Sequence, residues 1–225
     1  MDIIKKLAQE LAIKDEQAKA AVQLIDEGNT IPFIARYRKE MTGALNDETL
    51  RNLHERLLYL RNLEEKKEQV INAITEQDKM TDELKKKILS AETLVAVDDL
   101  YRPYRPKKQT RATKAKEKGL EPLANILLLQ ATSKSMEEEA QSFVNEAKGV
   151  ANVKDALAGA KDIIAEMIAD KADYRKSIRN CTMKQGRLVV KAKDEKAESV
   201  YEMYYDFSEE LSKITGYRVL AINRG

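Results

Sequence analysis

Apolar residues recur at helical spacing along most of the chain, and this pattern predicts a mainly α-helical protein. Gly28 is a typical helix end, while Thr30 and Pro32 are residue types that favour a helix start. Three short helices with tight turns resemble a helix-turn-helix, although plain helical packing accounts for the same pattern. These helices are expected over residues 3–11, 15–27 and 31–40.

The longest predicted helix begins at Asn46 or Asp47 and continues to about Gln77. At about 1.5 Å per residue it would be about 45 Å long, which suits a spine that crosses several subdomains. The alternative is a coiled-coil dimer, but the heptad pattern weakens at Glu64 and Lys67. Its apolar stripe consists of Leu50, Leu53, Leu57, Leu60, Leu63, Val70, Ile71 and Ile74.

Shorter helices are expected after Thr81 and after Thr93, and again after the proline-containing segment that follows residue 100. Ser135 and Glu138 have the spacing of a capping box for a helix that ends at Gly149. Strand patterns come only near the end, at residues 187–193 and 217–223, with a helix predicted between them. No further strand follows that would complete a sheet, so we expect this chain to be a fragment.

The predicted fold class is therefore mainly α: a multi-helix array with a helix-turn-helix-like N-terminal part, a long central helix and a small α/β element at the C-terminal end. Three regions are expected. Residues 1–100 would form the helix-turn-helix-like part with the long helix, residues 101–185 a basic loop with a second helical region, and residues 186–225 the start of an α/β element.

Composition supports a helical protein of the cytoplasm. Of 225 residues, 43% are hydrophobic and 35% charged, and only 8 Gly and 4 Pro interrupt the helical pattern. The one cysteine, Cys181, rules out an internal disulfide and suits a reducing compartment. We expect no signal peptide, and no stretch approaches the roughly 18 apolar residues of a membrane span.

Catalytic chemistry has little support in the sequence. His54 is the only histidine, so a paired-histidine metal site is excluded. Asp98 and Asp99 are adjacent, and neighbouring helix residues point about 100° apart rather than to one site. Glycine-rich phosphate loops are missing as well. We therefore predict no enzymatic activity, no metal and no cofactor.

Positive charge gathers in one short segment, although the whole chain carries only +2. Residues 101–118 hold eight basic side chains and one acidic one, and the sequence YRPYRP predicts a semi-rigid, polyproline-like loop. Arg and Lys bind phosphate, and Tyr101 and Tyr104 could stack on unpaired bases. Alternatively, the tyrosines pack on the helices and the charges are solvated. The candidate contacts are Arg102, Arg105, Lys107, Lys108 and Arg111.

Two further basic groups are candidates for nucleic-acid contact. Arg36 and Lys39 are three residues apart and share a face of the third helix, whereas Arg38 does not. The second group lies in a segment with seven basic residues and no acidic one, and this group could equally face another domain. It comprises Arg175, Lys176 and Arg179, followed by Lys184 and Arg187.

Four segments resemble the Tex family of bacterial transcription accessory proteins, and together they span nearly the whole chain. They are IPFIARYRKEMTGALNDETLRNLHERLLYLRNLEEKK, DDLYRPYRPKKQTRATKAKEKGLEPLANILL, GVANVKDALAGAKDIIAE and YRVLAINRG. The core DLYxPYxPK is the most specific match, while KITGYR departs from a family pattern that more often has Pro and His there. The resemblance implies an N-terminal helical region. Full-length members continue into an RNase H-like domain, a helix-hairpin-helix region and an RNA-binding OB-fold barrel.

Two functions follow as hypotheses. The first is a non-catalytic module that binds RNA or DNA weakly and in a salt-dependent way, as part of a transcription accessory factor. The second is an interaction scaffold that docks the other Tex domains, RNA polymerase or its elongation machinery, with little nucleic-acid binding of its own. The choice between DNA and RNA stays open.

Overall fold

The computed structural model describes residues 2–106, 109–194 and 196–224. In these ranges helices dominate, and the only strands form a two-stranded antiparallel sheet near the C-terminal end, which confirms the predicted fold class. The chain divides into two compact units, Met1–Tyr104 and Arg105–Gly225, and each is described by itself.

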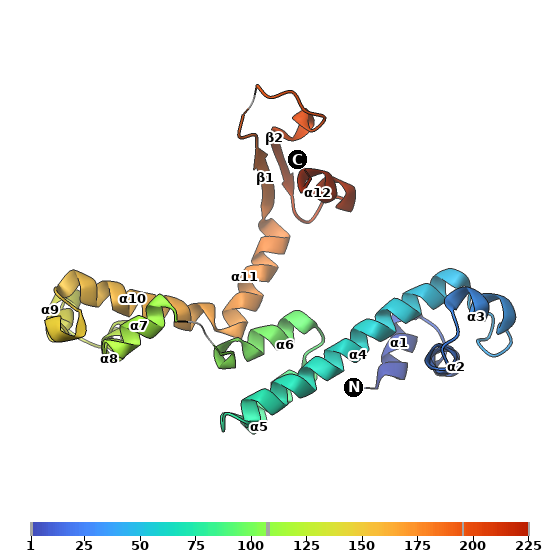
Figure 1. Cartoon of the computed structure of the whole chain (residues 1–225), viewed down its shortest axis with the longest axis horizontal. Coiled ribbons are helices and arrows are strands. Elements are labelled where there is room, and N and C mark those ends of the chain that lie inside the picture. The colour runs from blue at the N-terminus through green and yellow to red at the C-terminus, as the bar shows by residue number, and fades with distance from the viewer. Residues whose placement is uncertain (1, 107–108, 195, 225) are drawn as a thin grey trace. The chain divides into compact units, whose positions relative to one another are not determined.

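The first unit is built around one long helix, α4, which the shorter helices flank on both halves of its length (Figure 1). Asn46 begins α4, and its side-chain oxygen accepts a hydrogen bond of 2.7 Å from the backbone N–H of Thr49. The unit contains α1 (Ile3–Leu11), α2 (Asp15–Asp26), α3 (Ile31–Tyr37), α4 (Asp47–Thr75), α5 (Asp82–Ser90), α6 (Leu94–Tyr101) and the short 3-10 helix η1 (Arg102–Tyr104).

The buried stripe of α4 includes a charged residue. Lys67 is only 2% exposed and occupies the position between Leu63 and Val70. Its ammonium group donates hydrogen bonds to Glu64 Oε1 at 2.8 Å and to the carbonyl of Leu89 at 2.9 Å. The apparent break in the heptad pattern is therefore a buried lysine that continues the stripe. Helices α1, α2, α3, α5 and α6 of the same unit contact α4, as the spine interpretation predicts.

Two ion pairs join α4 to the helices before it. The guanidinium of Arg56 donates hydrogen bonds to both carboxylate oxygens of Glu10 in α1. The guanidinium of Arg61 does the same to Asp26 of α2, with both distances at 2.7 Å. The hydrogen bonds from Arg56 lower the pKa of Glu10 below its ordinary value of 4.5. The pKa of Asp26 is lowered for the same reason by Arg61.

The Glu10 pair predicts a pH-dependent contribution to stability. A carboxylate whose folded pKa is lowered stabilises the fold fully above its unfolded pKa, and this contribution disappears as pH falls through the folded pKa. Arg56→Gln should therefore reduce the free energy of unfolding by about 0.5–1 kcal/mol at pH 7, since both side chains are partly exposed. The difference from the parent protein should shrink below pH 4.

Denaturant titrations at neutral and acidic pH would measure this difference. Arg51→Gln is a matched control, because the Arg51–Asp47 pair is more exposed and lies within one helix. A difference between Arg56→Gln and the parent that stays constant with pH would contradict a role for Glu10 ionisation. The cation–π contact of Arg56 with Tyr59, at 4.7 Å, would then account for part of the difference.

The second unit has its core where α7 and α10 pack closely. Ala112 and Ala115 of α7 are buried with Ala156 and Ala160 of α10. At Gly159 an added Cβ would collide with Leu120, so the close approach requires small residues. The unit contains α7 (Arg111–Glu117), α8 (Glu121–Leu129), α9 (Met136–Gln141), η2 (Glu146–Lys148), α10 (Val153–Ala169), α11 (Ala172–Gln185), β1 (Arg187–Lys191), η3 (Glu202–Tyr204), β2 (Asp206–Glu210) and α12 (Gly216–Ile222).

The C-terminal element differs from its prediction in two places. The predicted helix between the strands is wrong, because β2 pairs with β1 in antiparallel register, with Arg187 opposite Glu210. The predicted second strand at 217–223 is also wrong, since these residues form α12.

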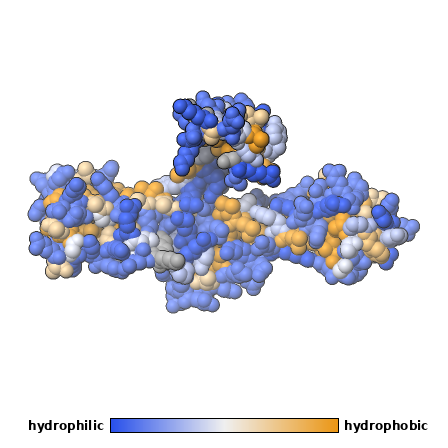
Figure 2. All heavy atoms as spheres, turned by 45° about the horizontal axis from the view of Figure 1, so that its top comes forward, coloured by the Kyte–Doolittle hydropathy of each residue, from blue (hydrophilic) through white to orange (hydrophobic). Residues whose placement is uncertain are grey.

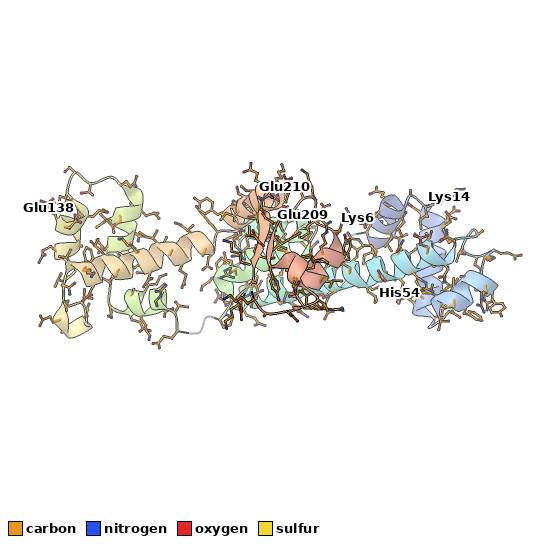
Figure 3. The ribbon with its side chains drawn as sticks, turned by 90° about the horizontal axis from the view of Figure 1, so that it is seen from above. Lys6, Lys14, His54, Glu138, Glu209 and Glu210 are labelled. Carbon is orange, nitrogen blue, oxygen red and sulfur yellow. The ribbon has the colours of Figure 1, made fainter. Side chains whose placement is uncertain are left out.

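An ion pair joins α12 to the sheet: the guanidinium of Arg218 donates hydrogen bonds to both carboxylate oxygens of Glu209 at 2.8 Å. Glu209 and Glu210 stand together at the end of β2 (Figure 3). Short apolar runs do not distinguish strand from helix, and here tertiary pairing decides.

Three predicted boundaries are also corrected. The YRPYRP segment is not a polyproline-like loop at its start, since α6 reaches Tyr101 and η1 follows. The Ser135 capping box is confirmed, but its helix ends at Gln141 rather than Gly149. Helix α3 ends at Tyr37 instead of residue 40.

Candidate nucleic-acid interface

The segment around α3 presents exposed aromatic and basic side chains together. Thr30 precedes α3 and Pro32 lies in its first turn, while buried Ile34 fixes the helix to the core. Beyond the helix, Gln17 donates hydrogen bonds to the carbonyls of Thr42 and Gly43. The backbone of the turn after α3 is thus held at both ends, and its exposed side chains extend from a fixed backbone.

Two aromatic rings on α3 face solvent. The ring centroids of Phe33 and Tyr37 are 5.3 Å apart, and Tyr37 is 65% exposed. The guanidinium of Arg38 lies over the Phe33 ring at 5.1 Å, and it also donates to the carbonyl of Tyr37. The two ring planes are tilted by 45°, and exposed ring faces of this kind can stack on an unpaired base.

Three cations surround these rings. Arg36, Arg38 and Lys39 are exposed, and none forms an ion pair within the described ranges. They line one hollow of about 600 Å³, to which Glu27 and Glu40 also contribute. We name Phe33, Arg36, Tyr37, Arg38 and Lys39 the α3 surface.

A helix that continued to residue 40 would place Arg38 on a different face from Arg36 and Lys39. This separation is wrong, because α3 ends at Tyr37 and Arg38 has a non-helical backbone, with φ −127° and ψ 26°. All three side chains reach the same hollow. Phe33 and Tyr37 are not among the contacts predicted from the sequence, although their spacing of four residues places both on one helix face and indicates a shared surface.

The basic group of residues 102–111 is divided between the units. Arg102 belongs to the first unit, whereas Arg105 and Arg111 belong to the second, and Lys107 and Lys108 lie outside the described residues. Arg111 is largely exposed and lies 3.5 Å from Asp162. Tyr101 and Tyr104 pack against the core of the first unit, which is the alternative considered from the sequence. A pair of neighbouring exposed rings lies on α3 instead.

The third basic group lies on α11, a helix without a buried residue among those described. Lys176 is exposed, while Arg175 and Arg179 are half-buried, and Arg175 donates to the carbonyl of Ala169 at 3.4 Å. Of the further members, Arg187 bonds Ser208 of β2. The group therefore follows one helix and the start of β1.

The candidate catalytic residues belong to different elements. His54 is half-buried on α4 (Figure 3), and Cys181 is exposed on α11, 3.7 Å from Gln185 Oε1. Asp98 lies 3.9 Å from Lys66, while Asp99 is buried. Across the described ranges, no three His, Cys, Asp or Glu side chains form a group that could hold a metal ion. None of the described helices combines the length and apolar character that crossing a membrane requires.

Residues 1–75 match the family described as Tex-like protein N-terminal domain, and residues 131–225 match the Tex central region-like family. The transcriptional accessory protein Tex of Neisseria gonorrhoeae is 41% identical over 228 residues, covering 100% of this chain and 30% of that protein. The protein tex of Bordetella pertussis is 43% identical over 99% of the chain and 28% of its own length. The human S1 RNA-binding domain-containing protein 1 is 31% identical over 100% of the chain and 23% of its own length. The chain spans less than a third of each of these relatives. It belongs to the Tex-like family and comprises that family's N-terminal and central regions.

Proposed function

We propose that this chain is a non-catalytic, nucleic-acid-binding module of a Tex-like transcription accessory factor, and that the α3 surface contacts single-stranded nucleic acid. One observation carries the proposal: two exposed, neighbouring aromatic rings lie beside three cations that have no ion pair in the described structure, and Tyr37 lines one hollow together with these cations. Stacking on the rings and phosphate contacts by the cations are the two interactions that single-strand binding requires. The names of relatives, which refer to transcription and to RNA binding, agree with this role.

The test is a titration of the full chain with a labelled single strand at several salt concentrations. Three phosphate contacts predict that the logarithm of the binding constant falls with log salt at a slope of about −2. Affinity should be weak, with a Kd of about 10⁻⁴ to 10⁻⁶ M at physiological salt. Arg36→Gln, Arg38→Gln and Lys39→Gln combined should make the slope shallower by about 2 units.

Lys79→Gln, Lys85→Gln and Lys86→Gln combined are the matched control. They remove three exposed cations from the same unit, none with an ion pair in the described ranges, and should leave the slope unchanged. Lys107→Gln, Lys108→Gln and Arg111→Gln combined test the loop group predicted from the sequence. If this loop variant, and not the α3 variant, made the salt slope shallower by about 2 units, the phosphate contacts would lie in the loop and not at the α3 surface.

A scaffold function is a second candidate, because one specific observation favours it. Between residues 172 and 224, none of the described residues is buried, while Ile178 is 64% exposed and Val200 85% exposed. Such apolar exposure is typical of a surface that a partner covers. The space-filling view shows apolar groups among mostly hydrophilic residues (Figure 2). Another Tex domain or RNA polymerase is the partner we propose in that case, and the parent chain would then show no salt-dependent titration.

A further inference from the structure

A second hollow lies in the C-terminal element, beside the β1–β2 hairpin. It measures about 420 Å³, within the range of about 300–1,000 Å³ typical of small-ligand pockets. The end of β1, the loop that follows it, η3 and the end of α12 enclose it. Its lining includes Lys191, Lys193, Tyr201, Tyr204, Tyr205 and Ile222.

The loop around this pocket is held by its own hydrogen bonds. The Tyr205 hydroxyl donates to the carbonyl of Ala197 at 2.6 Å. The backbone N–H of Ser199 donates to Glu202 Oε1 at 3.2 Å, and that of Lys196 donates to Asp194 Oδ1 at 3.0 Å. Tyr204 also meets Phe207 of β2 edge to face, with centroids 5.3 Å apart. The pocket is therefore formed before any ligand arrives.

The lining combines flat rings with positive charge. Three half-buried tyrosines supply ring surface, and Lys191 and Lys193 are exposed cations with no ion pair in the described ranges. Asp194 is the one carboxylate in the described lining, and it already accepts the hydrogen bond from Lys196 N–H. An apolar peptide side chain would use the rings but not the lysines. A phosphorylated aromatic group uses both.

We propose that this pocket binds one nucleotide, with the base against the tyrosine rings and the phosphate at Lys191 and Lys193. The occupant is either a free nucleotide or one nucleotide of a single strand. A pocket that binds a free nucleotide is independent of the function proposed for the α3 surface. A pocket that binds one nucleotide of a strand adds a second contact to that function, and in this case the proposal rests on it. Tyr201 is the best residue to alter, since its side chain lines the pocket while Tyr205 holds the loop.

The first experiment is an NMR titration of the full chain with uridine 5′-monophosphate. Amide signals of residues 191–193 and 201–205 should shift in a saturable way, both in the parent chain and in the combined Arg36→Gln, Arg38→Gln and Lys39→Gln variant. Shifts that fail to saturate or that spread evenly over the chain would overturn the proposal. If the triple variant did not change the salt slope of strand binding, while uridine 5′-monophosphate still shifted these signals, the α3 proposal would be overturned and this one would stand.

The second experiment compares pocket variants in binding both uridine 5′-monophosphate and a labelled uracil single strand. Tyr201→Leu should weaken binding about tenfold through lost stacking, and Tyr201→Phe should retain it. Lys193→Gln should weaken binding, whereas Lys196→Gln, in the same loop but outside the lining, should not. Weakened mononucleotide binding alone identifies a free nucleotide as the ligand, and weakened binding of both identifies a strand. Equal affinities of Tyr201→Leu and the parent for both probes, with the hairpin signals intact, would overturn the proposal.

Discussion

Replacing Lys67 with Ala is expected to lower the free energy of unfolding of the first unit by about 2–3 kcal/mol. The change removes a buried aliphatic stem from the stripe of α4, and it leaves the Leu89 carbonyl without the donor it has at 2.9 Å. Both effects act in the same direction, because a cavity and a partly buried acceptor that loses its donor each destabilise the folded state. Hydrogen exchange of α4 amides would measure the loss in this unit alone.

Lys67→Met is the control for the two contributions. Methionine keeps most of the volume of the stem but cannot donate a hydrogen bond, so its cost should be about 1 kcal/mol. If Lys67→Ala cost less than about 0.5 kcal/mol, the lysine would not belong to the buried stripe in solution.

Leu57→Ala is expected to cost about 3 kcal/mol, since Leu57 is 1% exposed in the centre of the first core. Its neighbour Leu58 is 53% exposed on the same helix, and Leu58→Ala should change stability by no more than about 0.5 kcal/mol. Denaturant unfolding of the two variants measures the difference. Equal effects would show that α4 packs through another face, as a coiled-coil dimer would allow.

The sequence predicts α4 of the first unit well because this helix is long, periodic and capped by a local side chain. The cap at Asn46 and the leucine stripe are both local patterns, and the structure contains both. Lys67 was not recognised as a stripe residue, because its burial depends on the carbonyl of Leu89, 22 residues away. No pattern within α4 reports that partner.

The C-terminal element was predicted poorly for the same physical reason. Residues 206–210 form a strand because β1 pairs with them, and residues 216–222 form a helix that the Arg218–Glu209 ion pair joins to β2. These interactions depend on tertiary proximity, which outweighs local propensity in short segments.

The candidate interface was predicted only in part. Arg36 and Lys39 follow from charge and spacing, whereas the inclusion of Arg38 depends on where α3 ends. Helix ends are uncertain by a residue or two even in known structures, so a prediction of helix faces is least secure there.

Photochemical crosslinking of a 5-iodouracil-containing single strand to the full chain tests the central claim most directly. Aromatic side chains that stack on the base are the expected partners, and peptide mapping locates the adduct. We predict an adduct on Phe33 or Tyr37, which Arg36→Gln, Arg38→Gln and Lys39→Gln combined should abolish together with phosphate binding at the α3 surface. Adducts confined to residues 101–111 or to α11, with none on α3, would contradict the account.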